Sequence, residues 1–422
     1  MNWLADKQVN VVSLGALFAL LIVFFSPNFG LKYGISPTLP SILLAFMGIW
    51  LVLRERAAVL ASTAQRRWLL IFALLFVPMV ISIPTSYDVR LSSGIAGASV
   101  LYAFAGVALI RALKGEGARH WLATGILIVL AFWCIDSVIQ YSLGQDPFGI
   151  TLTPDQRVVG PFDGNFRQAT LLAVLLPTAM GALWYRRHGR LYAMIFFALA
   201  GMVAMLAGVR MVMLMLIIVM AGFFLHLPAS RWKWLILPVL PIIAVLAVNL
   251  SPALQQRMST VTSAEHLNIE TLDKVLSYRA TIWETGARMI RLKPLNGVGV
   301  GAFDKAYRDF STRPKDVFRD GTVRVYHAHQ IYVSAGAEMG LPGLLSLLAV
   351  FGLGIYWYLS ASPLSRKRAW PWALALMVYF FPLNTQPPMF RHWTFPILLL
   401  LLAAMLSALD DLSADERASG PV

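Results

Sequence analysis

Two histidines stand directly before a long apolar stretch, in a position where they could handle protons. The segment 325–330 reads VYHAHQ and contains His327 and His329. Imidazole is the side chain that accepts a proton near neutral pH without special tuning. Alternate histidines could also bind a metal, but no third ligand follows them at a short spacing. The pattern therefore favours one of the two histidines as a general base over a metal site.

Arginines at the edges of apolar stretches form the second candidate group. Arg210 lies between two apolar stretches with almost no loop, Arg279 lies in the longest polar segment, and Arg391 lies in the last polar loop. Guanidinium groups are permanently charged and can bond phosphate oxygens in pairs. Snorkelling toward lipid headgroups, or an ordinary solvated helix face, would explain each arginine alone. No Asp-any-Asp pair stands at these boundaries, so if phosphate is bound there, arginines must bind it.

The composition predicts that membrane-spanning helices carry these residues. The 422 residues are 58% hydrophobic and 13% charged, against roughly 25% charged in soluble domains, and the mean hydropathy is +0.68. Apolar runs that could cross a hydrocarbon core of roughly 30 Å recur along the chain, and the first is expected to be a retained helix. We predict an all-α integral membrane protein with about twelve transmembrane helices, at residues 10–26, 36–53, 68–84, 93–112, 120–143, 166–185, 191–209, 211–226, 234–250, 329–359, 370–383 and 392–409.

The distribution of lysine and arginine predicts the orientation of these helices. With both termini in the cytoplasm, the inner segments carry seventeen Lys and Arg and the short outer segments carry six. The large loop between helices 9 and 10 then lies on the periplasmic side. The net charge of +14 resides in loops, which favours a lipid bilayer or phosphate over nucleic acid as its counterpart. We expect one membrane domain, with helices 1–9 in residues 1–250, the partly helical loop or cap in 251–328, and helices 10–12 with a cytoplasmic tail in 329–422.

Two parts of the large loop, and one residue outside it, carry more specific expectations. Residues 267–292 contain no proline and one glycine, and are predicted to form a helix. The glycines at 297, 299 and 301 favour a tight turn packed on the membrane domain over a phosphate-binding loop, because no strand-to-helix unit surrounds them. Asp136 lies inside an apolar stretch, where it could pair with an arginine or line a wet cavity. The sequence leaves both open for Asp136.

Three local patterns together resemble a known family. His329 and Gln330 begin the segment HQIYVSAGAEMGLPG, in which Gly340 and Gly343 follow at a fixed spacing. This segment resembles the histidine motif of the O-antigen ligases. Arg210 with the leucine four residues later, Arg279 in the large loop, and the turn GVGVGAF at 297–303 are similar to further features of that superfamily.

The resemblance implies a function and roles for particular residues. The protein would ligate O-antigen polysaccharide from undecaprenyl diphosphate to the lipid A core oligosaccharide at the periplasmic face of the bacterial inner membrane, in lipopolysaccharide biosynthesis. This glycosyl transfer would be inverting and would need neither metal nor cofactor. His329 would be the base and Arg210 and Arg279 the catalytic cations, with His327 as the alternative base. The expected secondary substrate contacts are Arg157, Arg324, Gln330 and Arg391.

Other functions remain open at this point. A polymerase that extends the lipid-linked glycan, or a protein O-oligosaccharyltransferase, would need the same base and cations. The moderate length, with no large domain after the last span, favours the lipid A core ligase. A polysaccharide or lipid transporter could also show twelve spans, but no internal duplication is visible and the polar candidates gather at one face of the membrane instead of the midplane.

Overall fold

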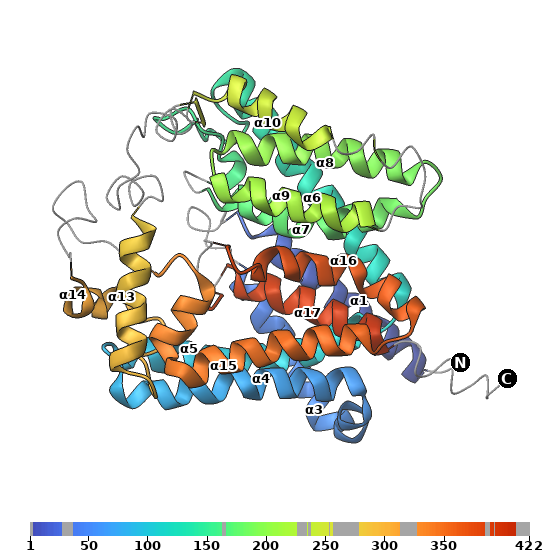
Figure 1. The fold of residues 1–422 in the computed structure, drawn as a ribbon. Helices are drawn as coiled ribbons and strands as arrows, with labels where there is room; N and C mark the ends of the chain where they lie inside the picture. Colours follow the sequence, from blue (N-terminus) through green and yellow to red (C-terminus); the bar gives the residue numbers. More distant parts are fainter. Residues whose placement is uncertain are drawn as a thin grey trace.

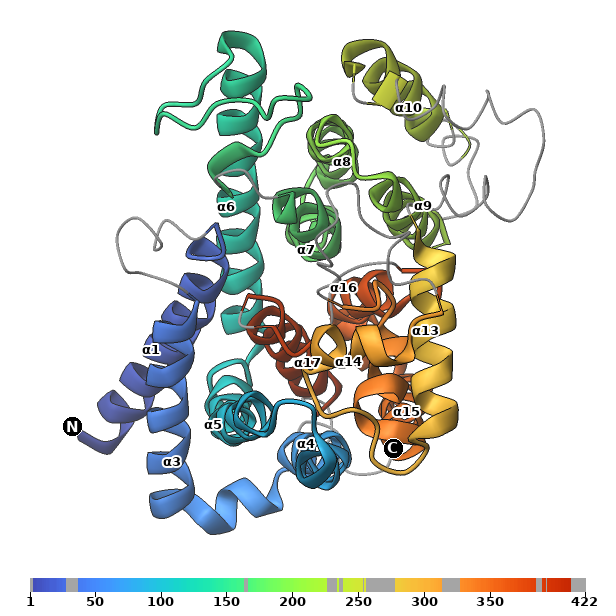
Figure 2. The same ribbon diagram turned by 90° about the vertical axis from the view of Figure 1, so that its left-hand side faces the viewer.

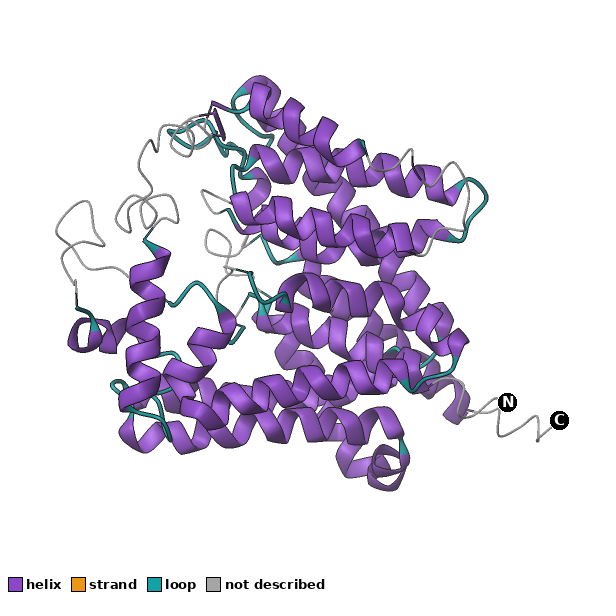
Figure 3. Cartoon of the chain, in the orientation of Figure 1, coloured by secondary structure: helices purple, strands orange, loops and turns teal. Residues whose placement is uncertain are grey.

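The computed structural model describes residues 3–27, 37–162, 166–225, 234, 238–252, 254–255, 278–312, 327–384, 389–391 and 393–410. The described part is helical and contains no strand (Figures 1 and 3). Its α-helices are α1 (Trp3–Phe24), α3 (Thr38–Ala61), α4 (Thr63–Ser82), α5 (Val89–Ala112), α6 (Glu116–Leu143), α7 (Arg167–Trp184), α8 (Gly189–Leu206), α9 (Arg210–Leu225), α10 (Val239–Leu250), α13 (Arg279–Leu292), α14 (Phe303–Phe310), α15 (Ile331–Leu359), α16 (Pro363–Phe380) and α17 (Phe395–Asp410).

Each of the twelve predicted spans overlaps one of these helices. Five stretches of the described residues are long and apolar enough to cross a membrane: Thr63–Thr85, Val89–Ala112, Glu116–Leu143, Gly189–Leu206 and Ile331–Leu359. Four shorter apolar helices lie among them, at Ser13–Phe24, Arg210–Leu225, Val239–Leu250 and Phe395–Asp410. The protein is therefore a helical membrane protein, and the full count of twelve spans stays a prediction.

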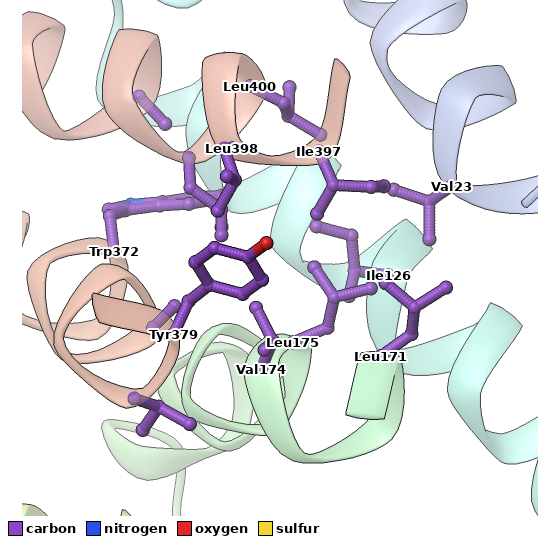
Figure 4. Packing of buried hydrophobic residues seen from close by; sticks show 14 of the residues in the cluster. Val23, Ile126, Leu171, Val174, Leu175, Trp372, Tyr379, Ile397, Leu398 and Leu400 are labelled. Atoms are coloured by element: carbon purple, nitrogen blue, oxygen red, sulfur yellow. The ribbon is translucent and has the colours of Figure 1, made fainter. Parts of the chain in front are cut away.

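The helices form two groups that share one apolar core. Helices α6 to α10 lie together in one group, while α1, α3, α4, α5, α15, α16 and α17 form the other (Figures 1 and 2). Figure 4 shows where they meet: Tyr379 of α16 lies among side chains of α7 and α17, with Ile126 of α6 and Val23 of α1 close by. Tyr379 and Ile126 are almost fully buried. This core fixes the ends of the helices relative to one another, and those ends carry the candidate site.

The described helices run between two opposite ends of the molecule, and one hydrogen bond serves to name each end. At one end the Ser62 hydroxyl donates to an Asp410 carboxylate oxygen at 3.3 Å, and we call this the Asp410 end. At the other end Gln330 Nε2 donates to the Pro382 carbonyl at 3.0 Å, and we call this the His329 end. Helix α16 runs from the Asp410 end to the His329 end, because its first residues follow α15 and its last residue precedes Pro382. Which end faces the periplasm stays a prediction.

Helices α13 and α14 belong to the large loop and pack against the His329 end. They lie side by side beside the beginning of α15 (Figures 1 and 2). A small apolar cluster joins them, in which Phe303 and Tyr307 of α14 and Met289 of α13 are completely buried. The predicted helix over 267–292 is only partly described: α13 begins at Arg279, directly after Tyr278, whose φ is +61°. Residues 256–277 lie outside the described part.

Candidate active site

The two histidines lie in the sharp bend that leads into α15. His329 has a φ of +51°, a left-handed conformation that is uncommon for residues other than glycine. The bend brings the two rings together, with 4.0 Å between the centroids of His327 and His329 and 47° between their planes. Gln330 then caps α15, since its side-chain oxygen accepts a hydrogen bond from the Val333 amide at 2.6 Å.

The electrostatic surroundings of His327 lower its pKa and disfavour it as a base. Burial, together with the nearby charges of His329, Arg391 and Arg279, lowers the pKa of His327 to about 2. His327 is therefore neutral at any physiological pH and is a poor proton acceptor. Its Nε2 atom is buried without a hydrogen-bond partner among the described residues. These properties of His327 argue against it as the base and leave His329 as the candidate.

Helix α13 brings Arg279 to the histidine bend. Arg279 is the first residue of α13, and its charge acts on His327. Four residues later, Trp283 Nε1 donates a hydrogen bond of 3.0 Å to the carbonyl of Ala328, which lies between the two histidines. The loop helix is thus fastened to the bend by a direct contact, and Arg279 and His329 belong to one site.

Arg210 begins α9 in the tight turn that the sequence predicts. Helix α8 ends at Leu206, and the chain reverses through Gly208, whose φ is +67°. A Cβ atom at Gly208 would lie 3.2 Å from Cδ of Arg157, so the Arg157 side chain runs along this turn. Arg157 forms an ion pair with Asp155, and its guanidinium lies 4.5 Å from the centroid of the Phe166 ring.

A chain of contacts joins the Arg210 turn to the histidines. Arg167, the first residue of α7, follows Phe166 directly, and its guanidinium lies 4.8 Å from the centroid of the Trp393 ring. Arg167 and Arg391 interact electrostatically, and Arg391 acts in turn on His327. We call the set Arg157, Arg167, Arg210, Arg279, His327, His329 and Arg391 the cationic arc. Sequence reasoning missed Arg167, although its position at the start of a span, as for Arg210, was the signal that could have identified it.

Three arginines of the arc occupy the same structural position. Arg167, Arg210 and Arg279 are the first residues of α7, α9 and α13, and His329 stands one residue before the cap of α15. These helix beginnings lie on the same side of the molecule, at the left of Figure 1. The first amide groups of a helix carry a partial positive charge and favour anions. The arc therefore combines side-chain and backbone positive charge on one side of the membrane helices.

The glycine-rich turn at 297–301 is packed on the membrane helices, as the sequence predicts. Gly299 has a φ of +101°, and a Cβ atom there would lie 2.0 Å from Oγ of Ser86. The Tyr87 amide donates to the Val298 carbonyl at 3.0 Å, and the Ser92 hydroxyl donates to the Val300 carbonyl at 2.8 Å. The amides of the turn also bond to protein groups, since the Val298 amide donates to the Ala337 carbonyl and the Gly299 amide to the Glu338 carbonyl, both at 2.9 Å. The turn therefore joins the loop to α5 and α15.

Gly340 breaks α15 near the site. Its φ of +68° and ψ of −169° lie outside the helical region, and a Cβ atom there would lie 2.6 Å from the Pro294 carbonyl oxygen. The residue therefore allows the loop backbone, and not a neighbouring helix, to approach closely. At Gly343 the crowding is with Met339 and Ala335 of the same helix. The first turns of α15 are thus set at an angle that directs the histidine bend toward α13.

A cavity opens beside Arg391. It has a volume of about 570 Å³ and lies between α5, α15 and α17. Arg90 and Arg391 line it together with Glu338, which accepts a hydrogen bond of 2.7 Å from the Gly301 amide. Most of the remaining wall is apolar, formed by residues such as Leu91 and Phe395. A group with a charged head and an apolar chain fits such a lining.

The structure gives different surroundings to the other residues that the sequence singled out. Both ends of the Gln330 amide are engaged within the protein, so its observed role is to fix the bend. Arg324 lies outside the described residues. Asp136 is 2% exposed, and the charged group that the described residues place beside it is Asp146, another carboxylate. In the described residues no three His, Cys, Asp or Glu side chains gather in a way that could hold a metal ion.

Comparison with known proteins finds one family to which part of the chain is similar. Residues 195–348 match the family model described as O-antigen ligase. Over these residues the chain is similar to the O-antigen ligase superfamily. No curated protein matches the chain. The matched region runs from α8 to the middle of α15, so Arg210, Arg279 and His329 all fall inside it, whereas Arg157, Arg167 and Arg391 fall outside.

This match supports a general function for the arc. Proteins of the O-antigen ligase type are glycosyl-transferring membrane enzymes, and this chain has the helical membrane character that such a function requires. The arc supplies an imidazole and several guanidinium groups at one end of the helices. The particular donor, acceptor and side of the membrane are finer questions.

Proposed function

We propose that the protein transfers O-antigen polysaccharide from undecaprenyl diphosphate to the lipid A core oligosaccharide at the periplasmic face of the inner membrane. The observation that carries this proposal is the cationic arc, in which Arg279 and His329 are joined through the Trp283 contact and Arg210 is joined to them through Arg157, Arg167 and Arg391. A diphosphate needs fixed cations, and a sugar hydroxyl needs a base. The arc contains both.

The reaction would proceed by one displacement. A hydroxyl oxygen of the acceptor sugar attacks the anomeric carbon of the donor, and its proton passes to the imidazole of His329. The bond between that carbon and the diphosphate oxygen breaks, and the electron pair leaves with undecaprenyl diphosphate. The anomeric configuration inverts, because attack and departure take place on opposite faces of the carbon. The acceptor gains the glycan and the released diphosphate gains one negative charge.

The arginines would act on the leaving group. Negative charge grows on the departing diphosphate as the bond breaks, so cations fixed near that oxygen stabilise the transition state more than the bound substrate. Arg210 and Arg279 are the proposed catalytic cations, and each begins a helix whose amide groups add positive charge. Arg391 and Arg157 are proposed to contact the substrate phosphates more remotely. The cavity beside Arg391 would admit the lipid chain of one substrate from the bilayer.

The base can be tested by a substitution that keeps the backbone conformation. Asparagine tolerates the left-handed conformation of His329 but has no basic nitrogen. In detergent with chelator present, we expect the parent to transfer glycan from purified lipid-linked donor to purified lipid A core. We expect His329→Asn and His329→Ala to lose about 100- to 10,000-fold in rate. Arg54→Gln, which changes an exposed cation at the Asp410 end, is the control and should retain the parent rate.

The outcomes of this assay differ in what they exclude. Full activity of a folded His329→Asn protein would exclude His329 as the base. A parent that is inactive on lipid A core but lengthens the lipid-linked glycan would be a polymerase. A parent that transfers glycan to a peptide would be a protein O-oligosaccharyltransferase. A parent whose transfer is lost with chelator and restored by a divalent metal would contradict the metal-free mechanism.

A further inference from the structure

A second cation-rich cavity lies at the Asp410 end, at the opposite end of α16 from the histidines. It measures about 560 Å³ and is enclosed by the beginning of α6, the end of α7 and the beginning of α16. Helix α16 has 18 residues, which corresponds to roughly 27 Å along its axis. The two cavities are therefore separate, and the cationic arc does not reach this one.

The lining of this cavity is strongly positive. Five basic side chains line it, namely Arg119, His120, Arg186, Lys367 and Arg368, whereas Glu116 is the one carboxylate among the described residues that line it. Glu116 pairs with Arg368 at 2.7 Å. Its single negative charge cannot balance the other cations, so the cavity has a surplus of positive charge.

One hydrogen bond and one buried atom without a partner describe how the cations of the cavity wall are held. A guanidinium nitrogen of Arg186 donates a hydrogen bond of 3.3 Å to Nε2 of His120, so the Arg186 charge faces an imidazole and not a carboxylate. The Nε atom of Arg368 is buried without a hydrogen-bond partner among the described residues. An anion bound beside Arg186 and Lys367 would supply the negative charge that this lining lacks.

The mouth of the cavity resembles a membrane interface. The Lys367 ammonium lies 4.6 Å from the centroid of the Tyr185 ring, and Tyr185 is 57% exposed. Leu364, which also lines the cavity, is 44% exposed. Exposed tyrosine beside basic side chains is typical of the headgroup level of a bilayer, where the ring contacts lipid and the cations contact phosphate.

We propose that this cavity binds a phosphate-bearing anion, and that its occupant is the headgroup of an anionic phospholipid. Arg186 and Lys367 would contact the phosphate, because both line the cavity and neither has a carboxylate partner among the ion pairs of the described residues. The lipid would bridge the end of α7 and the beginning of α16, and so brace the core helices that connect the two ends. The proposal is independent of the glycan transfer assigned to the arc.

Native mass spectrometry of the purified full-length chain in neutral detergent tests the site directly. The probes are dioleoyl phosphatidylglycerol, zwitterionic dioleoyl phosphatidylcholine and soluble glycerol 3-phosphate. We expect the parent to retain phosphatidylglycerol over phosphatidylcholine. The double variant Arg186→Gln/Lys367→Gln should bind phosphatidylglycerol at least about tenfold more weakly, since each cation near a headgroup contributes about 1 kcal/mol. The matched control is Arg54→Gln/Arg56→Gln, which removes two exposed cations at the same end and should bind as the parent does.

Further arms keep the test decisive. If the glutamine variant does not fold, Arg186→Lys/Lys367→Arg, which preserves both charges, should fold and retain the lipid. Competition by glycerol 3-phosphate at a concentration similar to that of the lipid would support the phosphate site and assign it to a soluble anion. The proposal is wrong if the folded glutamine variant binds phosphatidylglycerol as tightly as the parent, or if the parent shows no preference over phosphatidylcholine.

Discussion

The two ends of the molecule both concentrate basic side chains, but they arrange them differently. At the His329 end, Arg167, Arg210 and Arg279 each begin a helix, and an imidazole lies among them. At the Asp410 end, basic side chains from α6, from α16 and from the turn after α7 line a cavity, and one of them is paired with Glu116. The first arrangement combines a base with positive helix ends, which suits a reaction on a diphosphate. The second arrangement suits binding alone.

The largest expected effect on the rate of glycan transfer comes from substitutions at the His329 end, because that end is proposed to carry the reaction. We expect Arg210→Ala and Arg279→Ala each to lower the rate of glycan transfer about 100- to 1,000-fold, because each would remove a cation from the leaving diphosphate. Lysine at either position should restore only part of the rate, since it lacks the paired geometry of a guanidinium. Initial rates with saturating purified donor and acceptor measure this.

The proposed difference between the two ends is wrong if these substitutions lower the transfer rate no more than a substitution at the Asp410 end does. Arg54→Gln serves as the control, because Arg54 is exposed and lies outside both cavities. Equal rates for Arg279→Ala and Arg54→Gln, with both proteins folded, would remove Arg279 from the catalytic site. A raised KM at unchanged kcat would instead indicate that Arg279 only binds the substrate.

A second effect concerns what holds the His329 end in shape. Gly299→Ala should lower the free energy of unfolding by about 1–3 kcal/mol, because the new Cβ atom would meet Ser86 and the φ of +101° disfavours alanine. Gly352→Ala is the matched control, since open space surrounds that position on α15. Thermal unfolding in detergent compares them. Equal stability of the two variants would show that the glycine turn is not a rigid support for the site.

The part of this arrangement that the sequence predicted is the part encoded locally. Apolar runs predict the helices, and each predicted span overlaps one, because burial of an apolar stretch needs no knowledge of its neighbours. The turn at Arg210 and the packed turn at Gly299 follow from short segments in the same way. The position of Arg167 at the start of a span is visible in the sequence, but its link to the site depends on Trp393 and Arg391, more than 200 residues away in the chain. Such tertiary contacts leave no local pattern.

The third prediction uses the pKa of His327 to test how closely the arc is packed. Because burial lowers this pKa to about 2 in the folded protein, the unfolded chain binds more protons below its ordinary value near 6.5. Stability from this group is present above about pH 6.5 and is lost as the pH falls toward 2. Between pH 7 and pH 5 the loss is about 2 kcal/mol. His327→Asn should lack this loss.

The measurement is the free energy of unfolding of the parent and of His327→Asn, each at pH 7 and at pH 5. The difference between the two proteins should change by about 2 kcal/mol from pH 7 to pH 5. A constant difference would mean that His327 is hydrated and protonates normally. In that case the two histidines would be equivalent as bases, and the preference for His329 would rest on its sequence spacing alone.

The smallest expected effect distinguishes the arginines within the arc. Arg157 is paired with Asp155. Burial alone would raise the pKa of the Asp155 carboxyl, but the hydrogen bond from the Thr153 hydroxyl and the Arg157 charge outweigh burial, so the pKa is lowered. A guanidinium that is already paired with a carboxylate attracts a diphosphate less strongly. Arg157→Ala should therefore lower the transfer rate by less than about tenfold, which corresponds to less than about 1.4 kcal/mol in the activation free energy. Asp155→Asn should have the opposite sign, because it frees the Arg157 charge. A loss for Arg157→Ala as large as that for Arg210→Ala would mean that Arg157 contacts the diphosphate itself, and that the Asp155 pair opens when the substrate binds.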